Sequence, residues 1–107
     1  MDKKEKEYVI IVKTDFKKTR TDALSSETAY LVNSYENAKE ALHHLWEENY
    51  NNELADYNNV VNEEYSYHED DYAKITRDDG TFMEFSLIPK HMVSGEIMKK
   101  AVLFSKK

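Results

Sequence analysis

The fold of this chain is decided by residues 34–72, whose sequence is SYENAKEALHHLWEENYNNELADYNNVVNEEYSYHEDDY. In its first half, apolar and aromatic side chains recur every three or four residues, which is the spacing of one helix face. These are Tyr35, Ala38, Leu42, Leu45, Trp46 and Tyr50, with Asn49 beside them, while Glu40, His44, Glu47 and Glu48 fall opposite. Ser34 precedes the pattern and is a typical N-cap. We therefore predict a helix over residues 35–50 with Leu42, Leu45 and Trp46 in the core.

The second half of this stretch has a different character. Asn51 and Asn52 predict an interruption of the helix, because asparagine has a low helix propensity and favours caps and turns. Helical spacing resumes after them, so residues 53–62 form either a second short helix or a frayed continuation of the first. Residues 63–71 are so rich in Glu and Asp that we expect them to be exposed, whether they are ordered or not.

Four segments have the pattern of β-strands. Residues 8–12, YVIIV, are a continuous run of β-branched and aromatic side chains, which predicts a central strand buried on both faces. Residues 28–32 are expected to pair with it in antiparallel orientation. Residues 72–77 and 82–88 flank the sequence DDGT, which predicts a β-hairpin with a type I′ turn. Its inward side chains should be Ala73, Ile75, Met83, Phe85 and Leu87, and Pro89 should end the pairing.

The remaining segments complete the fold prediction. Residues 14–26 are polar and are expected to form a loop. Ser94 can cap a short helix that carries Ile97 and Met98, and a strand over residues 101–104 is the competing interpretation. We therefore predict one α+β domain over residues 1–107, with residues 1–7 frayed. It consists of a four-stranded, mainly antiparallel sheet, in the order β-β-α-(α)-β-β-(α), packed on one main amphipathic helix.

The composition excludes several classes of protein. The chain has no cysteine, which excludes a disulfide scaffold, a thiolate metal site and a cysteine nucleophile. Its two glycines are too few for a glycine-rich phosphate-binding loop. The apolar run near the amino terminus is too short for a signal peptide or a membrane span, so we expect a cytoplasmic protein with no membrane partner. No glycine-flanked serine accompanies a histidine in a catalytic pattern, so we expect neither an enzyme nor a cofactor.

Histidine and carboxylate side chains raise one metal-site hypothesis. His43 and His44 lie four residues before Glu47 and Glu48, a spacing that can hold a metal ion on one helix face. Two ligands do not complete a site, and His68 is isolated along the chain. The acidic positions also lack the alternating ligand spacing of an EF-hand calcium loop. We therefore expect no metal, and a small metal-binding protein that uses His43, His44 and nearby Glu residues is an alternative hypothesis.

The net charge of −6 is unevenly distributed along the chain. Residues 36–84 contain fourteen acidic and three basic side chains, net −11, whereas residues 1–35 are net +1 and residues 85–107 are net +4. Such an acidic field repels nucleic acid and attracts basic protein surfaces. The candidate partner-binding residues are Glu63, Glu64, Tyr65, Tyr67, Glu69, Asp70, Asp71, Asp78 and Asp79. The sequence leaves open whether the lysine-rich loop over residues 13–20 and the C-terminal lysines form a basic patch.

Carboxylates and tyrosines together favour one kind of function. Carboxylates can take the place of phosphates at the basic groove of a nucleic-acid enzyme, and tyrosines are enriched in binding hot spots. The chain is small, cysteine-free, acidic and rich in Asn, Lys and Tyr, and in this it is similar to proteins of phages and mobile elements from AT-rich bacteria. That similarity implies an inhibitor of a nucleic-acid-binding enzyme, of the anti-CRISPR or anti-restriction type, acting by nucleic-acid mimicry. We therefore expect a non-catalytic acidic protein-interaction module. The alternative is a structural or homo-oligomeric accessory domain that associates through an exposed apolar sheet face.

Overall fold

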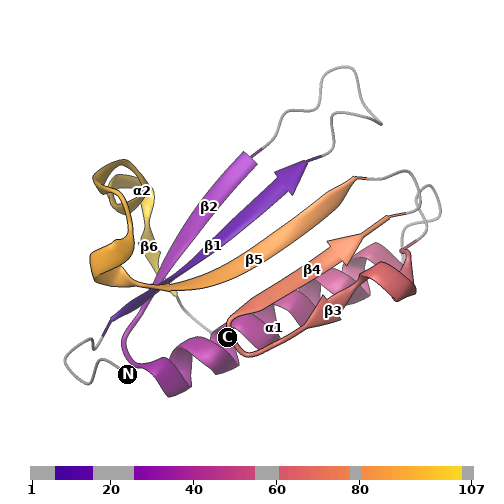
Figure 1. Ribbon diagram of the computed structural model, residues 1–107, viewed down its shortest axis with the longest axis horizontal. Helices are drawn as coiled ribbons and strands as arrows, with labels where there is room; N and C mark the ends of the chain where they lie inside the picture. Colours follow the sequence, from indigo (N-terminus) through magenta and orange to yellow (C-terminus); the bar gives the residue numbers. More distant parts are fainter. Residues whose placement is uncertain (1–6, 16–25, 55–60, 78–80, 105–107) are drawn as a thin grey trace.

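The computed structural model of the chain describes residues 7–15, 26–54, 61–77 and 81–104 (Figure 1). The strands are β1 (Tyr8–Asp15), β2 (Ser26–Val32), β3 (Tyr67–His68), β4 (Tyr72–Thr76), β5 (Phe82–Pro89) and β6 (Val102–Leu103). The helices are α1 (Tyr35–Leu54) and α2 (Gly95–Lys100), with the 3₁₀ turns η1 (Glu63–Tyr65) and η2 (Lys90–Met92). The strands form one sheet in the order β3-β4-β5-β1-β2-β6, and α1 packs on one of its faces. The predicted α+β class is therefore confirmed.

The predicted four-stranded sheet is wrong in detail, because the described residues form a six-stranded mixed sheet. The two additional strands, β3 and β6, have two residues each and lie at opposite edges. β6 pairs with β2 in parallel, whereas the other neighbouring strands are antiparallel. A two-residue strand is too short to show the alternation on which strand prediction depends, so the sequence contained no signal for β3. The strand β6 lies within residues 101–104, where a strand was the competing interpretation.

The strand β1 is buried on both faces, as its sequence predicted. Its side chains Tyr8, Ile10 and Val12 belong to the core that α1 covers. Val9 and Ile11 belong to a second apolar cluster on the opposite face. β1 also has a partner along each edge, since it pairs with β2 and with β5. The continuous β-branched run therefore predicted the position of this strand in the sheet correctly.

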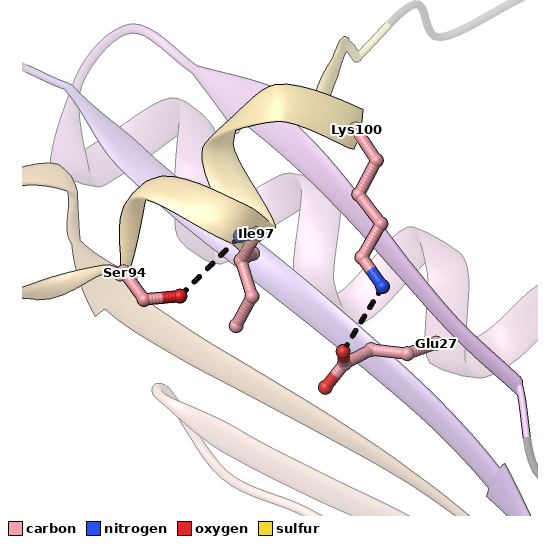
Figure 2. A network of polar contacts seen from close by, with 4 residues as sticks. All are labelled: Glu27, Ser94, Ile97 and Lys100. Atoms are coloured by element: carbon pink, nitrogen blue, oxygen red, sulfur yellow. Dashed lines mark hydrogen bonds and ion pairs between the residues drawn. The ribbon is translucent and has the colours of Figure 1, made fainter.

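The second apolar cluster is covered by the segment around α2, so both faces of the sheet carry a packed layer. Ile97 and Met98 of α2 pack against the cluster around Val9. The Ser94 hydroxyl accepts a hydrogen bond from the Ile97 amide at 3.3 Å, which confirms the predicted cap (Figure 2). At the other end of α2, Lys100 donates to Glu27 of β2 at 3.2 Å (Figure 2). Both interpretations of the tail are confirmed, each for a different part of it. The helix α2 ends at Lys100, and the strand β6 follows at Val102–Leu103.

The helix α1 begins where the sequence predicted and ends later. The Ser34 hydroxyl accepts from the Asn37 amide at 3.1 Å, so the N-cap is confirmed. The predicted interruption at Asn51 and Asn52 is wrong, since α1 continues through both to Leu54. Asparagine costs a helix only about 0.7 kcal/mol per residue relative to alanine, and these two side chains are exposed.

The other segment boundaries also differ from the sequence prediction. Residues 55–60, most of the predicted second helix, lie outside the described residues, and Val61 forms an isolated β-bridge with Arg77 instead of a helical turn. The loop predicted over residues 14–26 is shorter at both ends, because Thr14 pairs with Ser26 in the sheet. Glu7, expected in the frayed leader, accepts a hydrogen bond from the Lys90 ammonium at 2.8 Å.

The hairpin of β4 and β5 has the predicted pairing. Ala73 lies opposite Phe85 and Ile75 lies opposite Met83, and all four side chains are buried under α1. Pro89 is the last residue of β5. The predicted type I′ turn falls on residues 78–80, which lie outside the described residues.

The burial of Leu42 predicts a large effect of truncation. Leu42 has no exposed surface and lies in the core between α1 and the sheet. Leu42→Ala should lower the free energy of unfolding by about 3 kcal/mol, because it removes buried methyl groups and leaves a cavity. Glu48→Ala, on the exposed face of the same helix, should change it by less than about 0.5 kcal/mol. Urea denaturation followed by circular dichroism measures both, and equal losses would contradict the assignment of Leu42 to the core.

The backbone of Ser34 predicts a difference between two substitutions at the start of α1. Its φ of 145° lies where side chains with a Cβ are strained, and its hydroxyl caps the helix. Ser34→Ala keeps the strain and loses the cap, so it should cost about 1 kcal/mol. Ser34→Gly loses the cap and relieves the strain, so it should cost only a few tenths of a kcal/mol. The order of the two midpoints in thermal denaturation tests this, and a less stable glycine variant would contradict it.

Candidate functional site

The candidate site is built on the acidic tract, which we define as residues 63–71. The tract begins with η1, contains β3 and runs along the outer edge of β4. Backbone hydrogen bonds fix it at both ends, from the Asn62 amide to the Thr76 carbonyl at 2.7 Å and from the Glu69 amide to the Tyr72 carbonyl at 2.7 Å. Between them, the Ser66 hydroxyl accepts from the Thr76 amide at 3.0 Å. The tract therefore follows β4 over its full length.

The acidic side chains of the tract face solvent. Glu63, Glu64, Glu69, Asp70 and Asp71 are all exposed, and none is ion-paired with another residue in the described part of the chain. Tyr65 is 59% exposed and Tyr67 is 44% exposed. The structure thus brings seven of the nine predicted partner-binding residues together on one edge of the sheet. The other two, Asp78 and Asp79, lie outside the described residues.

Tyrosine side chains line the face of the sheet next to the tract. The rings of Tyr67 and Tyr72 have centroids 5.9 Å apart, and the Tyr72 hydroxyl donates to the Glu84 carboxylate at 2.5 Å. Burial raises the pKa of Tyr72 above its ordinary value, and the bond to Glu84 raises it further. Tyr72 therefore remains a protonated donor, which holds the carboxylate of Glu84 in place.

His68 is the residue of the tract that turns inward, toward α1. Its Nε2 lies 3.2 Å from Nδ1 of His43, and the two ring centroids are 4.4 Å apart. Burial lowers the pKa of His68, and the neighbouring His43 lowers it further, while Asp70 acts in the opposite direction. The prediction that His68 is isolated is therefore wrong. The two histidines are 25 residues apart, and only the pairing of His68 with Ala73 on the α1 side of the sheet brings them together.

Trp46 attaches this region of α1 to β4. Its Nε1–H donates to the Lys74 carbonyl at 3.0 Å, and its ring stacks on Tyr50 with centroids 4.7 Å apart. The Trp46 ring also lies near the ring of His68, with 5.7 Å between the two centroids. Trp46 is partly buried against the core rather than fully inside it. Its indole thus fixes the position of α1 relative to the strand that carries the acidic tract.

A groove joins the acidic tract to the exposed face of α1. It encloses about 500 Å³ and is lined by Glu36, Lys39, Glu40, His43, His44, Glu47, His68 and Asp70. Four of these are carboxylates, and Lys39 lies 3.5 Å from Glu36 and thereby balances one of them. The acidic surface therefore continues onto the helix. Sequence analysis placed Glu40, His44 and Glu47 on the exposed face correctly but did not connect that face with the tract.

The structure bears first on the metal-site hypothesis. Among the described residues, no group of three or more His, Asp or Glu side chains is arranged to hold a metal ion. Of the predicted i,i+4 pairs, His43 and Glu47 approach to 3.9 Å.

Two of the C-terminal lysines, Lys90 and Lys100, are each bound to a glutamate. Of the lysine-rich loop predicted over residues 13–20, Lys13 belongs to the strand β1, and residues 16–20 lie outside the described residues, as do the last two lysines. No helix in the described part of the chain is long and apolar enough to cross a membrane.

The fold and this surface define an α+β protein with an acidic edge, built from one strand edge and one helix face. The chain matches no protein-family model, no curated protein and no solved structure. The function must therefore be argued from the surface itself.

The hydrogen bond of Trp46 predicts how its substitution affects stability. Trp46→Phe keeps a ring on Tyr50 but leaves the Lys74 carbonyl without its indole donor, so the free energy of unfolding should fall by about 1–2 kcal/mol. Tyr50→Phe keeps the stacked ring and loses only a hydroxyl, so it is the matched control and should change stability by less than about 0.5 kcal/mol. Urea denaturation measures both. Equal values for the two variants would show that the indole bond contributes nothing.

Proposed function

We propose that this protein is a non-catalytic interaction module that binds a basic protein surface through the acidic tract and the adjoining groove. The observation that carries the proposal is the concentration of charge on the tract. Five exposed carboxylates lie within nine consecutive residues, and none is ion-paired in the described part of the chain. The carboxylates of the groove extend this field onto α1. A field of one sign steers and orients a partner of the opposite sign.

Charges elsewhere on the sheet are arranged differently. Lys13 of β1 lies between Glu27 of β2 and Glu84 of β5, and Glu84 lies opposite Lys74 of β4. Opposite charges thus alternate across four strands, which is the stabilising arrangement for cross-strand pairs. Opposite charges therefore alternate in register across these strands, whereas the tract carries charges of one sign. The charge of the tract is therefore a local feature, which supports a role in binding.

Exposed tyrosines supply the second component of a binding surface. Tyr65 and Tyr67 present large rings beside the carboxylates. Tyrosine loses few rotatable bonds when it is immobilised, and it combines an apolar ring with a polar hydroxyl. Charged groups at the rim and aromatic anchors near the centre are the usual division of labour in an interface.

The partner we propose is the basic groove of a nucleic-acid-binding enzyme. Such a groove is lined by Arg and Lys side chains placed to contact phosphates, and carboxylates can occupy the same positions. The protein would then inhibit the enzyme by mimicking nucleic acid. An anti-CRISPR or anti-restriction role is the more specific form of this proposal, and it rests on composition alone.

Salt dependence of partner binding tests the proposal. A tagged form of the protein captures its partner from a cell lysate, and mass spectrometry identifies it. The dissociation constant should rise at least tenfold between about 50 and 300 mM NaCl, because screening weakens the attraction. Neutralising the tract by the combined changes Glu63→Gln, Glu64→Gln, Glu69→Gln, Asp70→Asn and Asp71→Asn should weaken binding at low salt by at least tenfold. A DNA oligonucleotide should compete for the same partner.

The matched control neutralises exposed glutamates away from the tract, with Glu48→Gln on α1 and Glu96→Gln on α2. This variant should bind the partner within about twofold of the unaltered protein. Binding that is insensitive to salt, or unchanged in the tract variant, would refute the proposal. Because the tract variant removes five charges and the control removes two, a loss of binding that scales with the number of charges removed would show that only total charge matters.

The homo-oligomeric alternative has a narrower structural basis. It requires an exposed apolar sheet face, whereas the sheet face away from α1 is covered at β1 and β2 by the segment around α2. The exposed apolar side chains near that end are Met92 of η2 and Val102 and Leu103 of the edge strand β6. Association through these apolar side chains would be insensitive to salt, so the salt titration also separates this alternative from the proposed function.

A further inference from the structure

We propose that His43 and His68 form a chelating pair for a divalent transition-metal ion of the zinc and copper class. The site would join α1 to β3, beside the groove described above. It differs from the helix-face arrangement predicted from the sequence, because its second ligand comes from the acidic tract and not from the helix.

The distance between the two nitrogens carries the proposal. His43 Nδ1 and His68 Nε2 are 3.2 Å apart. Zinc binds histidine nitrogens at roughly 2.0–2.1 Å in tetrahedral geometry, so two ligand nitrogens on one ion are about 3.3 Å apart. The observed separation therefore matches that of two ligand nitrogens on one ion. The same separation also permits an N–H···N hydrogen bond, which is the state that the metal would replace.

The far nitrogen of His43 has a carboxylate nearby. Nε2 of His43 lies 3.9 Å from the Glu47 carboxylate, and a carboxylate on the far nitrogen of a ligand histidine is the usual outer-shell partner of a metal site. In the hydrogen bond between Nδ1 of His43 and Nε2 of His68, either ring can be the donor. When the metal binds, both of these nitrogens present lone pairs, so the proton between them moves to the other nitrogen of its own ring and each imidazole stays neutral.

The remaining coordination positions are open to water or to a carboxylate. Asp70 is exposed, lies two residues after His68 and lines the same groove, so rotation of its side chain can supply a third ligand. No group of three or more His, Asp or Glu side chains in the described residues is arranged to hold a metal ion. We therefore infer a site with two fixed ligands, His43 and His68. Imidazole nitrogens suit zinc, copper and nickel, whereas magnesium and calcium require oxygen ligands.

Thermal denaturation with zinc tests the site. Free zinc at about ten times the dissociation constant should raise the melting temperature of the unaltered protein by roughly 5 °C, because the ion binds only the folded pair. His43→Gln and His68→Gln should each abolish the rise. His44→Gln, in the same groove, and His91→Gln, on η2, are the matched controls and should retain it.

Tryptophan fluorescence gives a second readout that does not depend on stability. Trp46 is the sole tryptophan, and its ring centroid lies 6.5 Å from that of His43 and 5.7 Å from that of His68. Cupric ion bound between the histidines should quench its emission in the unaltered protein and in the two controls, but not in the two ligand variants. Circular dichroism establishes that each variant is folded.

Three results would overturn the proposal. The first is no binding of zinc or copper by the unaltered protein up to about 1 mM free ion. The second is binding that His68→Gln leaves unchanged, which would show weak association with exposed histidines only. The third is loss of binding in His44→Gln with retention in His68→Gln, which would assign the ion to the helix face. If a ligand variant does not fold, nitrogen-15 NMR of the unaltered protein decides, since zinc must shift the imidazole signals of His43 and His68.

Discussion

The packing of α1 on the sheet is the interaction on which the rest of the structure depends. Leu42, on the inner face of α1, is completely buried, and the Trp46 indole donates to the Lys74 carbonyl. These two contacts fix the distance of α1 from the sheet and its rotation about its own axis. That rotation places His43 where His68 of β3 can reach it. The acidic groove forms between the same two elements. The position of the charged surface is therefore set by apolar burial and one indole hydrogen bond, because the carboxylates themselves repel one another.

Patterns that depend on neighbouring residues were predicted well. The Ser34 cap needs only the local sequence and is confirmed. The apolar stripe of α1 is confirmed in part, because Ala38, Leu42 and Leu45 are buried whereas Tyr35 is 38% exposed. The end of α1 was predicted wrongly at Asn51, because a modest propensity cost is offset once the rest of the helix is packed. The meeting of His43 and His68 depends on strand register and on the rotation of α1 together, and no local pattern encodes it.

Buried polar residues show a second limit of sequence analysis. Arg77 counted toward the basic side chains of the acidic middle segment, yet it is only 6% exposed. Its backbone amide donates to the Thr81 carbonyl at 2.9 Å, and it bridges to Val61, so it belongs to the closure of the hairpin and the start of the acidic tract. The charge of Arg77 still counts toward the net charge of the middle segment, but its side chain lies inside the fold and not on the acidic surface.

The attachment of the acidic tract to β4 supports the proposed role of the tract in recognition. Carboxylates that only keep a protein in solution need no fixed arrangement, and a disordered acidic segment would serve as well. Here Asn62 and Glu69 donate backbone hydrogen bonds to β4, and Ser66 accepts one, so the tract is ordered before any partner arrives. Ordering a free segment on binding costs about 1–2 kcal/mol per residue in backbone entropy. Because folding has already met that cost, the partner we propose would bind a tract whose backbone is already ordered, and such preorganisation favours selective binding.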